Sequence, residues 1–220
     1  MDPRNLCDRH PLGWGSERGS IQRAFEMPWV INFEIRRVCS IPIYRLFFAL
    51  HGIPWGKHWR VWGMPIIQRY RGSQISLGDG LLLRSWHICN PLAPNHPVVL
   101  ATRSTEAVIK VGQNVGMTGT TLVATERVEI GPGVQIGANA VIVDTDFHPV
   151  EPWLRRTHGP SGRHAAVLIE REVFIGMNCL ILKGVRIGSG SVIGAGSVVT
   201  RDIPPGVIAA GNPARVVRPI

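Results

Sequence analysis

The sequence has few charged residues for a chain of its length. Of 220 residues, 18% are charged and 45% are hydrophobic, so the chain can bury a sizeable core and is not a disordered tail. Lysine and glutamate are scarce, whereas glycine (25 residues) and proline (17 residues) are abundant. This composition favours a β-rich, turn-rich fold in which helices are a minority. We therefore expect one main domain with appendages.

The sequence also lacks an apolar run of the roughly 20 residues that cross a bilayer. The nearest candidate is "SIPIYRLFFALHGIPW", residues 40–55, which contains Arg45 and two prolines. Cationic and tryptophan side chains surround it within residues 28–62. Two interpretations stay open: peripheral association of residues 28–62 with a membrane surface, or packing of their apolar face on the main domain. We favour the second.

Cysteine and charge patterns exclude other classes. The four cysteines lie far apart and fit no CxxC metal motif, and no secretory signal pattern is present. We therefore expect free thiols and a cytoplasmic location, with the inner face of the membrane as the place of any peripheral contact. The net charge of +9 comes without a run of like charges or a recognisable nucleic-acid module, so we expect a basic protein that handles anions and no nucleic-acid partner.

A step of six residues organises most of the chain. Six fits neither the helical period of 3.6 nor a simple hairpin, but it fits short strands that turn a corner and stack on the coil below. Glycine follows several of the aliphatic residues, where a tight corner disfavours a Cβ atom. The fold class is therefore predicted as mainly β, built of hexapeptide repeats. The aliphatic positions are Ile130, Ile136, Ile142, Ile175, Ile181, Ile187, Ile193 and Val199.

The repeat also predicts the domain organisation. Residues 1–27 carry no periodicity and are expected to form a mobile N-terminal tail. Residues 28–74 are predicted as an amphipathic, partly helical extension, and residues 75–220 as the repeat domain. Within the domain, the Pro-rich segment 90–107 is predicted as a surface loop, and residues 148–174 as a long loop that interrupts the repeat.

Two stretches resemble a known family. These are "IGSGSVIGAGSVVTRDIPPGVIAAGNPARVVRPI" (187–220) and "DTDFHP" (144–149), which look like hexapeptide-repeat acyltransferases, in particular the galactoside and maltose O-acetyltransferase branch. The resemblance covers roughly residues 75–220. It implies a left-handed parallel β-helix, a homotrimer with each active site shared between two chains, and acetyl-CoA as co-substrate with no metal required. It also implies acetyl transfer to a sugar hydroxyl in polysaccharide or glycoconjugate biosynthesis.

His148 is the candidate catalytic residue. It is the first residue of the predicted loop, and the resembling family carries its catalytic histidine in a similar His-Pro context. Attack of an alcohol on a thioester needs a general base, and imidazole has a suitable pKa. We expect His148 to take the proton from the acceptor hydroxyl and to return a proton to the departing thiolate. His158 and His164 are interpreted as parts of a polar lid.

Other residues are candidates for binding. Asp144 and Asp146 are predicted either to orient the imidazole or bind sugar hydroxyls, or only to cap the corner of the repeat, and both alternatives stay open. Thr118 in "GMTGTTL" offers a hydroxyl to the acceptor. The resemblance further implies that acetyl-CoA contacts small residues and guanidinium groups. The implied positions are Ala195, Thr200, Arg201, Arg215 and Arg218.

Three other functions fit the sequence less well. N-acylation of an amino sugar on a nucleotide carrier uses the same fold, and the sequence barely separates it from O-acylation. A metalloenzyme resembling γ-type carbonic anhydrases needs three histidines in register, but only His148 is attached to a well-phased coil. A scaffold without catalytic activity is disfavoured because both the CoA-end residues and the His-Pro break are present.

Overall fold

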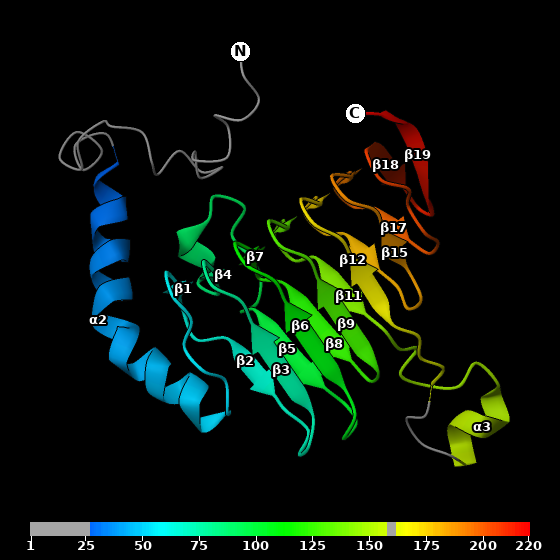
Figure 1. Ribbon diagram of the computed structural model, residues 1–220, viewed down its shortest axis with the longest axis horizontal. Coiled ribbons are helices and arrows are strands. Elements are labelled where there is room, and N and C mark those ends of the chain that lie inside the picture. Colours follow the sequence, from blue (N-terminus) through cyan, green and yellow to red (C-terminus); the bar gives the residue numbers. More distant parts are fainter. Residues whose placement is uncertain (1–26, 158–161) are drawn as a thin grey trace. The chain divides into compact units, whose positions relative to one another are not determined.

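The computed structural model describes residues 27–157 and 162–220 (Figure 1). The chain divides into two units, Met1–Cys39 and Ser40–Ile220. The predicted mobile tail therefore lies almost wholly outside the described residues. In the first unit, the described residues form the first part of helix α2 (Pro28–Leu50). There, Arg37 forms an ion pair with Glu34 at 2.7 Å.

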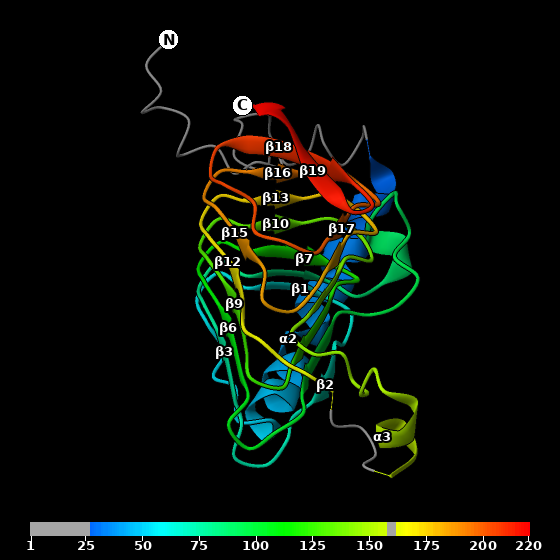
Figure 2. The same cartoon turned by 90° about the vertical axis from the view of Figure 1, so that its right-hand side faces the viewer.

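The second unit is a parallel β-helix with three sheets. Within each sheet the strands pair in parallel, except that β18 and β19 pair antiparallel. Sheet A consists of β1 (Arg60–Trp62), β4 (Leu82–Arg84), β7 (Gly116–Thr118), β10 (Gln135–Ile136), β13 (Phe174–Ile175), β16 (Val192–Ile193), β18 (Val207–Gly211) and β19 (Ala214–Pro219). Figure 2 shows strands of this sheet stacked one above the other.

The other two sheets complete the triangular coils. Sheet B consists of β2 (Ile66–Gln68), β5 (Val99–Thr102), β8 (Thr121–Ala124), β11 (Val141–Val143), β14 (Leu180–Ile181) and β17 (Val198–Val199). Sheet C consists of β3 (Gln74–Leu77), β6 (Val108–Val111), β9 (Arg127–Ile130), β12 (Val167–Ile169) and β15 (Arg186–Ile187). Coil 1 is β1-β2-β3, and coils 2 to 6 follow in order. The corners are named A–B, B–C and C–A after the sheets that they join.

The step of six places the aliphatic residues in the core, as predicted. Ile136, Ile175 and Ile193 are register partners on β10, β13 and β16, and all three are buried. The corner glycines are needed because successive coils lie very close together. A Cβ atom on Gly176 would lie 2.5 Å from the backbone nitrogen of Ala195 in the next coil, so any larger residue would force the coils apart.

Three predicted boundaries are wrong. The repeat domain begins near Arg60, not at residue 75, because β1, β2 and β3 pair with the strands of coil 2. The excursion ends before Val167, not at residue 174, because β12 pairs with β9 and β15. Within the predicted loop 90–107, β5 is a strand of sheet B and pairs with β2 and β8.

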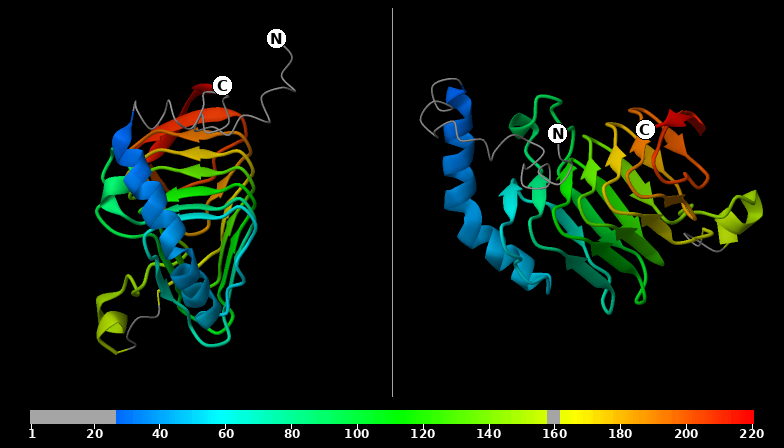
Figure 3. Two further views of the ribbon diagram at one scale, coloured as in Figure 1. Left: turned by 90° about the vertical axis from the view of Figure 1, so that its left-hand side faces the viewer. Right: turned by 45° about the horizontal axis from the view of Figure 1, so that its top comes forward.

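The C-terminal part of α2 packs on coil 1 (Figure 3). This agrees with the interpretation that the apolar face of residues 28–62 packs on the main domain. Phe48 is fully buried, and its ring centroid lies 5.3 Å from that of Trp59. The hydroxyl of Tyr44 accepts a hydrogen bond of 3.1 Å from the backbone N–H of Gly63. Ile43, Leu46 and Leu50 are exposed on the same helix. No helix in the described ranges is both long and apolar enough to cross a membrane.

Two carboxylates cap corners between neighbouring coils. Asp144 is fully buried and accepts hydrogen bonds of 2.7–2.8 Å from the backbone N–H groups of Thr125, Glu126 and Arg127. Glu170 accepts hydrogen bonds from both the hydroxyl and the backbone N–H of Ser189, and from Arg186. At these corners the chain turns out of the β-ladder, so some backbone N–H groups have no backbone acceptor, and the carboxylates accept their hydrogen bonds.

Replacing Glu170 is expected to destabilise the fold in a pH-dependent way. Hydrogen bonds from Ser189 and Arg186 lower the pKa of Glu170 from 4.5 to about 2. Its stabilising effect is therefore complete above about pH 4.5 and is lost as the pH falls towards 2. Thermal unfolding should give a lower midpoint for Glu170→Gln at pH 7, and a difference from wild type that shrinks below pH 4.5. Glu106→Gln, at an exposed carboxylate, is the control, and a constant difference down to pH 2 would contradict the assignment.

Replacing Asp144 is expected to cost more than replacing an exposed cap. Asp144→Ala leaves three backbone N–H groups without their charged acceptor, which corresponds to roughly 3 kcal/mol of unfolding free energy. Asp202→Ala, at an exposed residue whose carboxylate accepts a single hydrogen bond from the Arg186 N–H, should cost less than about 1 kcal/mol. Urea denaturation measures both variants. Equal losses would show that the three amides find other partners.

Candidate functional site

The excursion leaves the β-helix at a corner with a short, paired stem. It begins after β11 of sheet B and returns at β12 of sheet C, carrying α3 (Pro152–Thr157) away from the coils (Figure 1). Thr145 and His164 form an antiparallel bridge, and the backbone N–H of Asp146 donates to the carbonyl of Arg163 at 2.9 Å. The two ends of the excursion therefore fix each other at the B–C corner of coil 4.

His148 lies at this root and is exposed. Its backbone N–H donates to the carbonyl of Asp146 at 2.7 Å, and Phe147 between them has a φ of 62°. The guanidinium of Arg103 lies 5.5 Å from the centroid of the Phe147 ring. Among the described residues, no hydrogen-bond partner of the imidazole is present. The backbone is thus held tightly while the ring stays open to a ligand.

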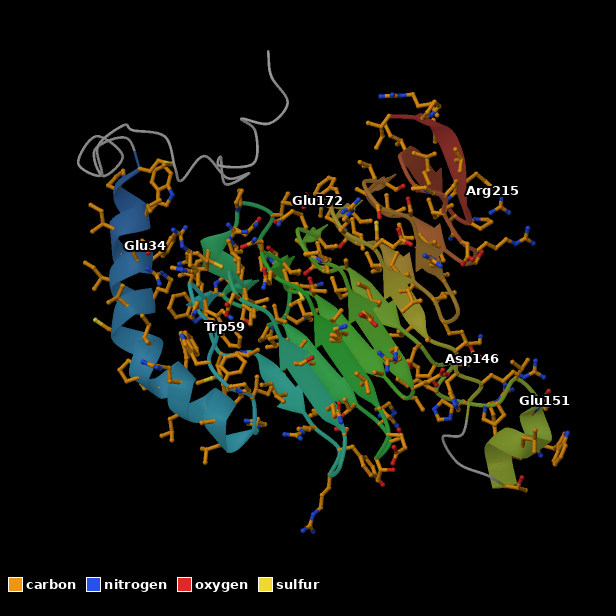
Figure 4. All side chains as sticks on the ribbon, in the orientation of Figure 1. Glu34, Trp59, Asp146, Glu151, Glu172 and Arg215 are labelled. Carbon is orange, nitrogen blue, oxygen red and sulfur yellow. The ribbon has the colours of Figure 1, made fainter. Side chains whose placement is uncertain are left out.

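Neither nearby aspartate orients the imidazole in this structure. Asp146 forms an ion pair with Lys183 of coil 5, with 2.5 Å between its carboxylate oxygen and the Lys183 nitrogen. Figure 4 shows Asp146 at the root of the excursion, with Glu151 farther out along it. The Asp144 carboxylate is occupied by its three backbone donors. Of the two alternatives predicted for Asp144, the geometry supports the corner cap.

Thr118 does not lie beside His148 within one copy of the chain. It ends β7 in sheet A and therefore stands at the A–B corner, whereas His148 stands at the B–C corner. Thr118 is only 4% exposed. The segment between β4 and β5 lies over this corner, where the Asn95 N–H donates to the Asn139 side-chain oxygen at 3.0 Å. Within one copy, Thr118 and His148 therefore stand at opposite edges of sheet B.

The residues implied for acetyl-CoA lie at two corners and on the terminal strand. Ala195 is at the A–B corner of coil 6, and Thr200 and Arg201 follow β17 at the B–C corner. Arg215 and Arg218 lie on β19, which pairs with the end of sheet A. All five side chains are exposed. Thr200 and Arg201 therefore share the corner of His148, two coils farther along.

Lys183 and Arg103 were missed in the sequence. Both follow strands of sheet B and stand at the B–C corner, so with Arg201 they form a column of cations on either side of His148. A positional signal was available for Lys183. Lys183 stands two residues after the inward-facing Ile181, as Arg201 stands two residues after the inward-facing Val199. The spacing alone predicts that their side chains share one edge.

The outward-facing side chains of sheet B form a second apolar cluster, separate from the core of the β-helix. The side chains there alternate with the core residues along each strand, yet they are aliphatic. The central residues of this patch, Ala101, Val123 and Val143, are only 6–7% exposed, so much of the patch is already covered within one copy. The patch consists of Ala101, Val123 and Val143, packed with Val99, Val141, Phe147 and Leu182. Because Phe147 belongs to the patch, the patch extends to the root of the excursion.

Two grooves among the described residues lie away from His148. One, of about 580 Å³, is lined by residues of α2 and of the following turn, including Leu46 and Trp55. Another, of about 420 Å³, is lined by His51, Tyr70 and Thr102 among others. Within residues 27–157 and 162–220, no group of three or more His, Cys, Asp or Glu side chains is arranged to hold a metal ion.

Comparisons with known proteins find similarity in part of the repeat. Residues 166–201 match the model of the bacterial transferase hexapeptide (six repeats). The chain is 46% identical over 100 residues to a galactoside O-acetyltransferase of Lactococcus lactis, covering 46% of this chain and 47% of that protein. It is 41% identical over 88 residues to a 2,3,4,5-tetrahydropyridine-2,6-dicarboxylate N-acetyltransferase of Staphylococcus aureus, covering 40% of this chain and 31% of that protein.

A solved structure shares the fold. AntD, an N-acyltransferase from Bacillus cereus in complex with dTDP and 3-hydroxybutyryl-CoA, aligns with a TM-score of 0.58 at 18% identity, covering 75% of this chain and 81% of that one. The chain spans about half the length of its galactoside relative and less of the N-acetyltransferase. Residues 166–201 are thus similar to the bacterial hexapeptide transferases, and the chain has a left-handed parallel β-helix fold.

Proposed function

We propose that the chain is an acetyl-CoA-dependent O-acetyltransferase that modifies a sugar hydroxyl in polysaccharide or glycoconjugate biosynthesis. The observation that carries the proposal is the placement of His148. Its imidazole is exposed, while its backbone is fixed by the stem of the excursion. Similarity to a galactoside O-acetyltransferase supports the reaction class.

In the proposed reaction, His148 acts as general base. The imidazole takes the proton from the acceptor hydroxyl as the oxygen attacks the thioester carbonyl, and it then returns the proton to the sulfur of CoA as the thioester bond breaks. Proton transfer of this kind needs a group within hydrogen-bond reach of the hydroxyl, which an open, well-anchored imidazole provides. The Asp146–Lys183 ion pair ties the root of the excursion to coil 5 and so limits movement of the base.

The cation column at the B–C corner supports acetyl-CoA as the co-substrate. Arg201 presents positive charge at the corner of His148, beside the ion-paired Lys183, and guanidinium groups bind phosphates. Thr200 and the corner at Ala195 allow close approach of a slender pantetheine arm because their side chains are small. Arg215 and Arg218 on β19 extend the positive surface at the C-terminal end.

A homotrimer completes the site in this proposal. The apolar outer face of sheet B would turn towards a threefold axis, where burial of aliphatic side chains stabilises the assembly. Sheet B is flanked by the A–B and B–C corners. Packing of three such faces brings the A–B corner of one copy against the B–C corner of the next, so His148 of one copy would face Thr118 of its neighbour.

N-acylation of an amino sugar is the second candidate. Similarity to an N-acetyltransferase of Staphylococcus aureus favours it, and a base beside a CoA groove serves either acceptor. The linkage in the product distinguishes the two, because an O-acetyl ester is cleaved by mild hydroxylamine and an amide is not.

Membrane contact through residues 28–62 stays a prediction, as does the cytoplasmic location. Ile43, Leu46 and Leu50 are exposed on α2, with Arg45 among them, which is a suitable composition for peripheral binding. Within the first unit, Trp29, Ile31, Ile35 and Val38 are also exposed. Flotation of the full chain with anionic liposomes would support the contact, and its absence would oppose it.

Replacing His148 is expected to abolish most of the transfer. Loss of a general base lowers the rate by about 10²–10⁴, so kcat of His148→Ala should fall in that range while binding of CoA is retained. Release of free thiol from acetyl-CoA, with a panel of sugars and glycan fragments as acceptors, measures the rate.

His58→Asn is the matched control for His148→Ala. His58 is also exposed and has a φ of 58°, a conformation that asparagine tolerates. This variant should keep wild-type turnover. Turnover of His148→Ala within a few-fold of wild type would show that His148 is not the base.

Charged substitutions on sheet B are expected to break the trimer. Val141→Glu combined with Leu180→Glu places two carboxylates on the outer face of adjacent strands, where burial of charge is costly. Sedimentation should show a trimer for wild type and a folded monomer for the double variant. Phe174→Glu, at an exposed position on sheet A, should remain trimeric. A monomeric wild type would overturn the assembly.

A further inference from the structure

Arg84 has an unusual environment at the A–B corner of coil 2. It is the last residue of β4 and is half-buried. Its guanidinium carbon lies 5.5 Å from the centroid of the Trp62 ring, and Trp62 is itself 4% exposed. A cation over an aromatic face gains a favourable interaction with the ring. This contact holds the guanidinium close to the Trp62 ring at the corner.

Arg84 has no counter-charge in the described part of the chain. No carboxylate there forms an ion pair or hydrogen bond with it, and the titratable groups that act on its charge are Cys89 and Arg60. Burial lowers the pKa of Arg84, with repulsion by Arg60 adding to the effect. Burial also raises the pKa of the Cys89 thiol to about 11, so the thiol is neutral at pH 7. A partly buried cation without a partner is costly, which indicates that a ligand supplies the missing charge.

The surroundings of Arg84 are preorganised. Ser85, the next residue, donates its backbone N–H to the carbonyl of Trp62 at 2.7 Å, and its hydroxyl accepts from the N–H of Val98 at 3.1 Å. Ser85 thus closes the loop between β4 and β5 at both ends. Trp86 packs directly against Gly63, where a Cβ atom would collide with the ring. No side chain at position 63 could therefore fit without displacing Trp86.

We propose that Arg84 binds an anionic group of the acceptor, a phosphate or a carboxylate, and so makes the enzyme selective for acidic sugars or sugar phosphates. The inference rests on the proposed function and on the shared site, since the A–B corner of one copy faces His148 of the next. Arg84 belongs to coil 2 and His148 to coil 4, and two coils span about 10 Å along the axis. A hexose with a linked phosphate bridges that distance. The planar fork of arginine pairs with both oxyanions in the same bidentate way.

Binding of simple anions tests the inference without relying on turnover. Inorganic pyrophosphate and glucuronate, titrated calorimetrically into the full-length protein, represent the phosphate and carboxylate sources. Arg84→Gln should weaken binding of at least one by about tenfold or more, the loss expected for one charge-assisted pair. Arg171→Gln removes the same charge from an exposed arginine at the C–A corner and should leave binding unchanged.

Two further measurements test whether the anion binds at Arg84 itself. Saturating CoA should not displace the anion, because the implied CoA positions belong to coil 6 and the terminal strand. Arg84→Lys keeps the charge but loses the planar fork, so it should bind with intermediate affinity while the thermal midpoint stays near wild type. Equal weakening in Arg171→Gln, displacement by CoA, or no binding of either anion to wild type would overturn the inference.

Kinetics separate failure of this inference from failure of the proposed function. Arg84→Gln should raise the KM for an acidic acceptor about tenfold and leave the KM for its neutral counterpart and kcat within a few-fold. If wild type and Arg84→Gln transfer acetyl groups to neutral sugars at equal rates and neither binds the anions, the anion site is refuted. The proposed acetyltransferase function would still stand. Anion binding that depends on Arg84, without transfer to any acceptor, would support the site and refute the proposed function.

Discussion

The backbone contact between successive coils is the constraint on which the structure depends. Parallel ladders hold the strands of each sheet, apart from the β18–β19 pair, to their counterparts one coil away, and at the corners the chains approach so closely that side chains are excluded. A Cβ atom on Gly131 would lie 2.7 Å from the nitrogen of Arg171 in the next coil. Because the coils cannot slide or separate, residues at one phase of the repeat form straight columns. Function is therefore arranged along corners and faces.

This constraint explains why an excursion can leave the β-helix without weakening it. The corner at coil 4 is closed by its own stem, through the Thr145–His164 bridge, and by the Asp144 carboxylate, which holds the corner of coil 3. The chain outside the stem can therefore vary while His148 stays anchored. In the proposed reaction, a base held on such a rigid corner would meet its substrate at small entropic cost.

The repeat was predictable where the step of six is regular, and the errors have physical causes. Val61 stands six residues before Ile67, so the repeat begins earlier in the chain than we predicted. Ile169 stands six residues before Ile175, so the repeat also resumes earlier after the excursion. The glycine that follows Ile175 is absent after Ile169, because Glu170 takes that corner through its hydrogen bonds with Ser189 and Arg186. A corner that is held by polar side chains cannot be recognised from the spacing of aliphatic residues and glycines.

The site was only partly predictable for a different reason. His148 stands at a break that the sequence itself displays, but the environment of a carboxylate does not follow from its position. Asp144 and Asp146 are two residues apart, yet one is buried against backbone amides and the other pairs with Lys183. Arg84 was missed because its isolation depends on which side chains the fold brings near it, and spacing carries no information about that.

Assembly of the site between copies, with His148 of one chain facing the A–B corner of the next, is the feature on which the proposed function depends. A crystal structure of the assembled protein with CoA bound tests it most directly. We expect three copies with sheet B turned inward, and the CoA sulfur in the groove between two copies at roughly 3–4 Å from the His148 imidazole. CoA bound within one copy and away from His148, or a solvent-facing sheet B, would contradict it.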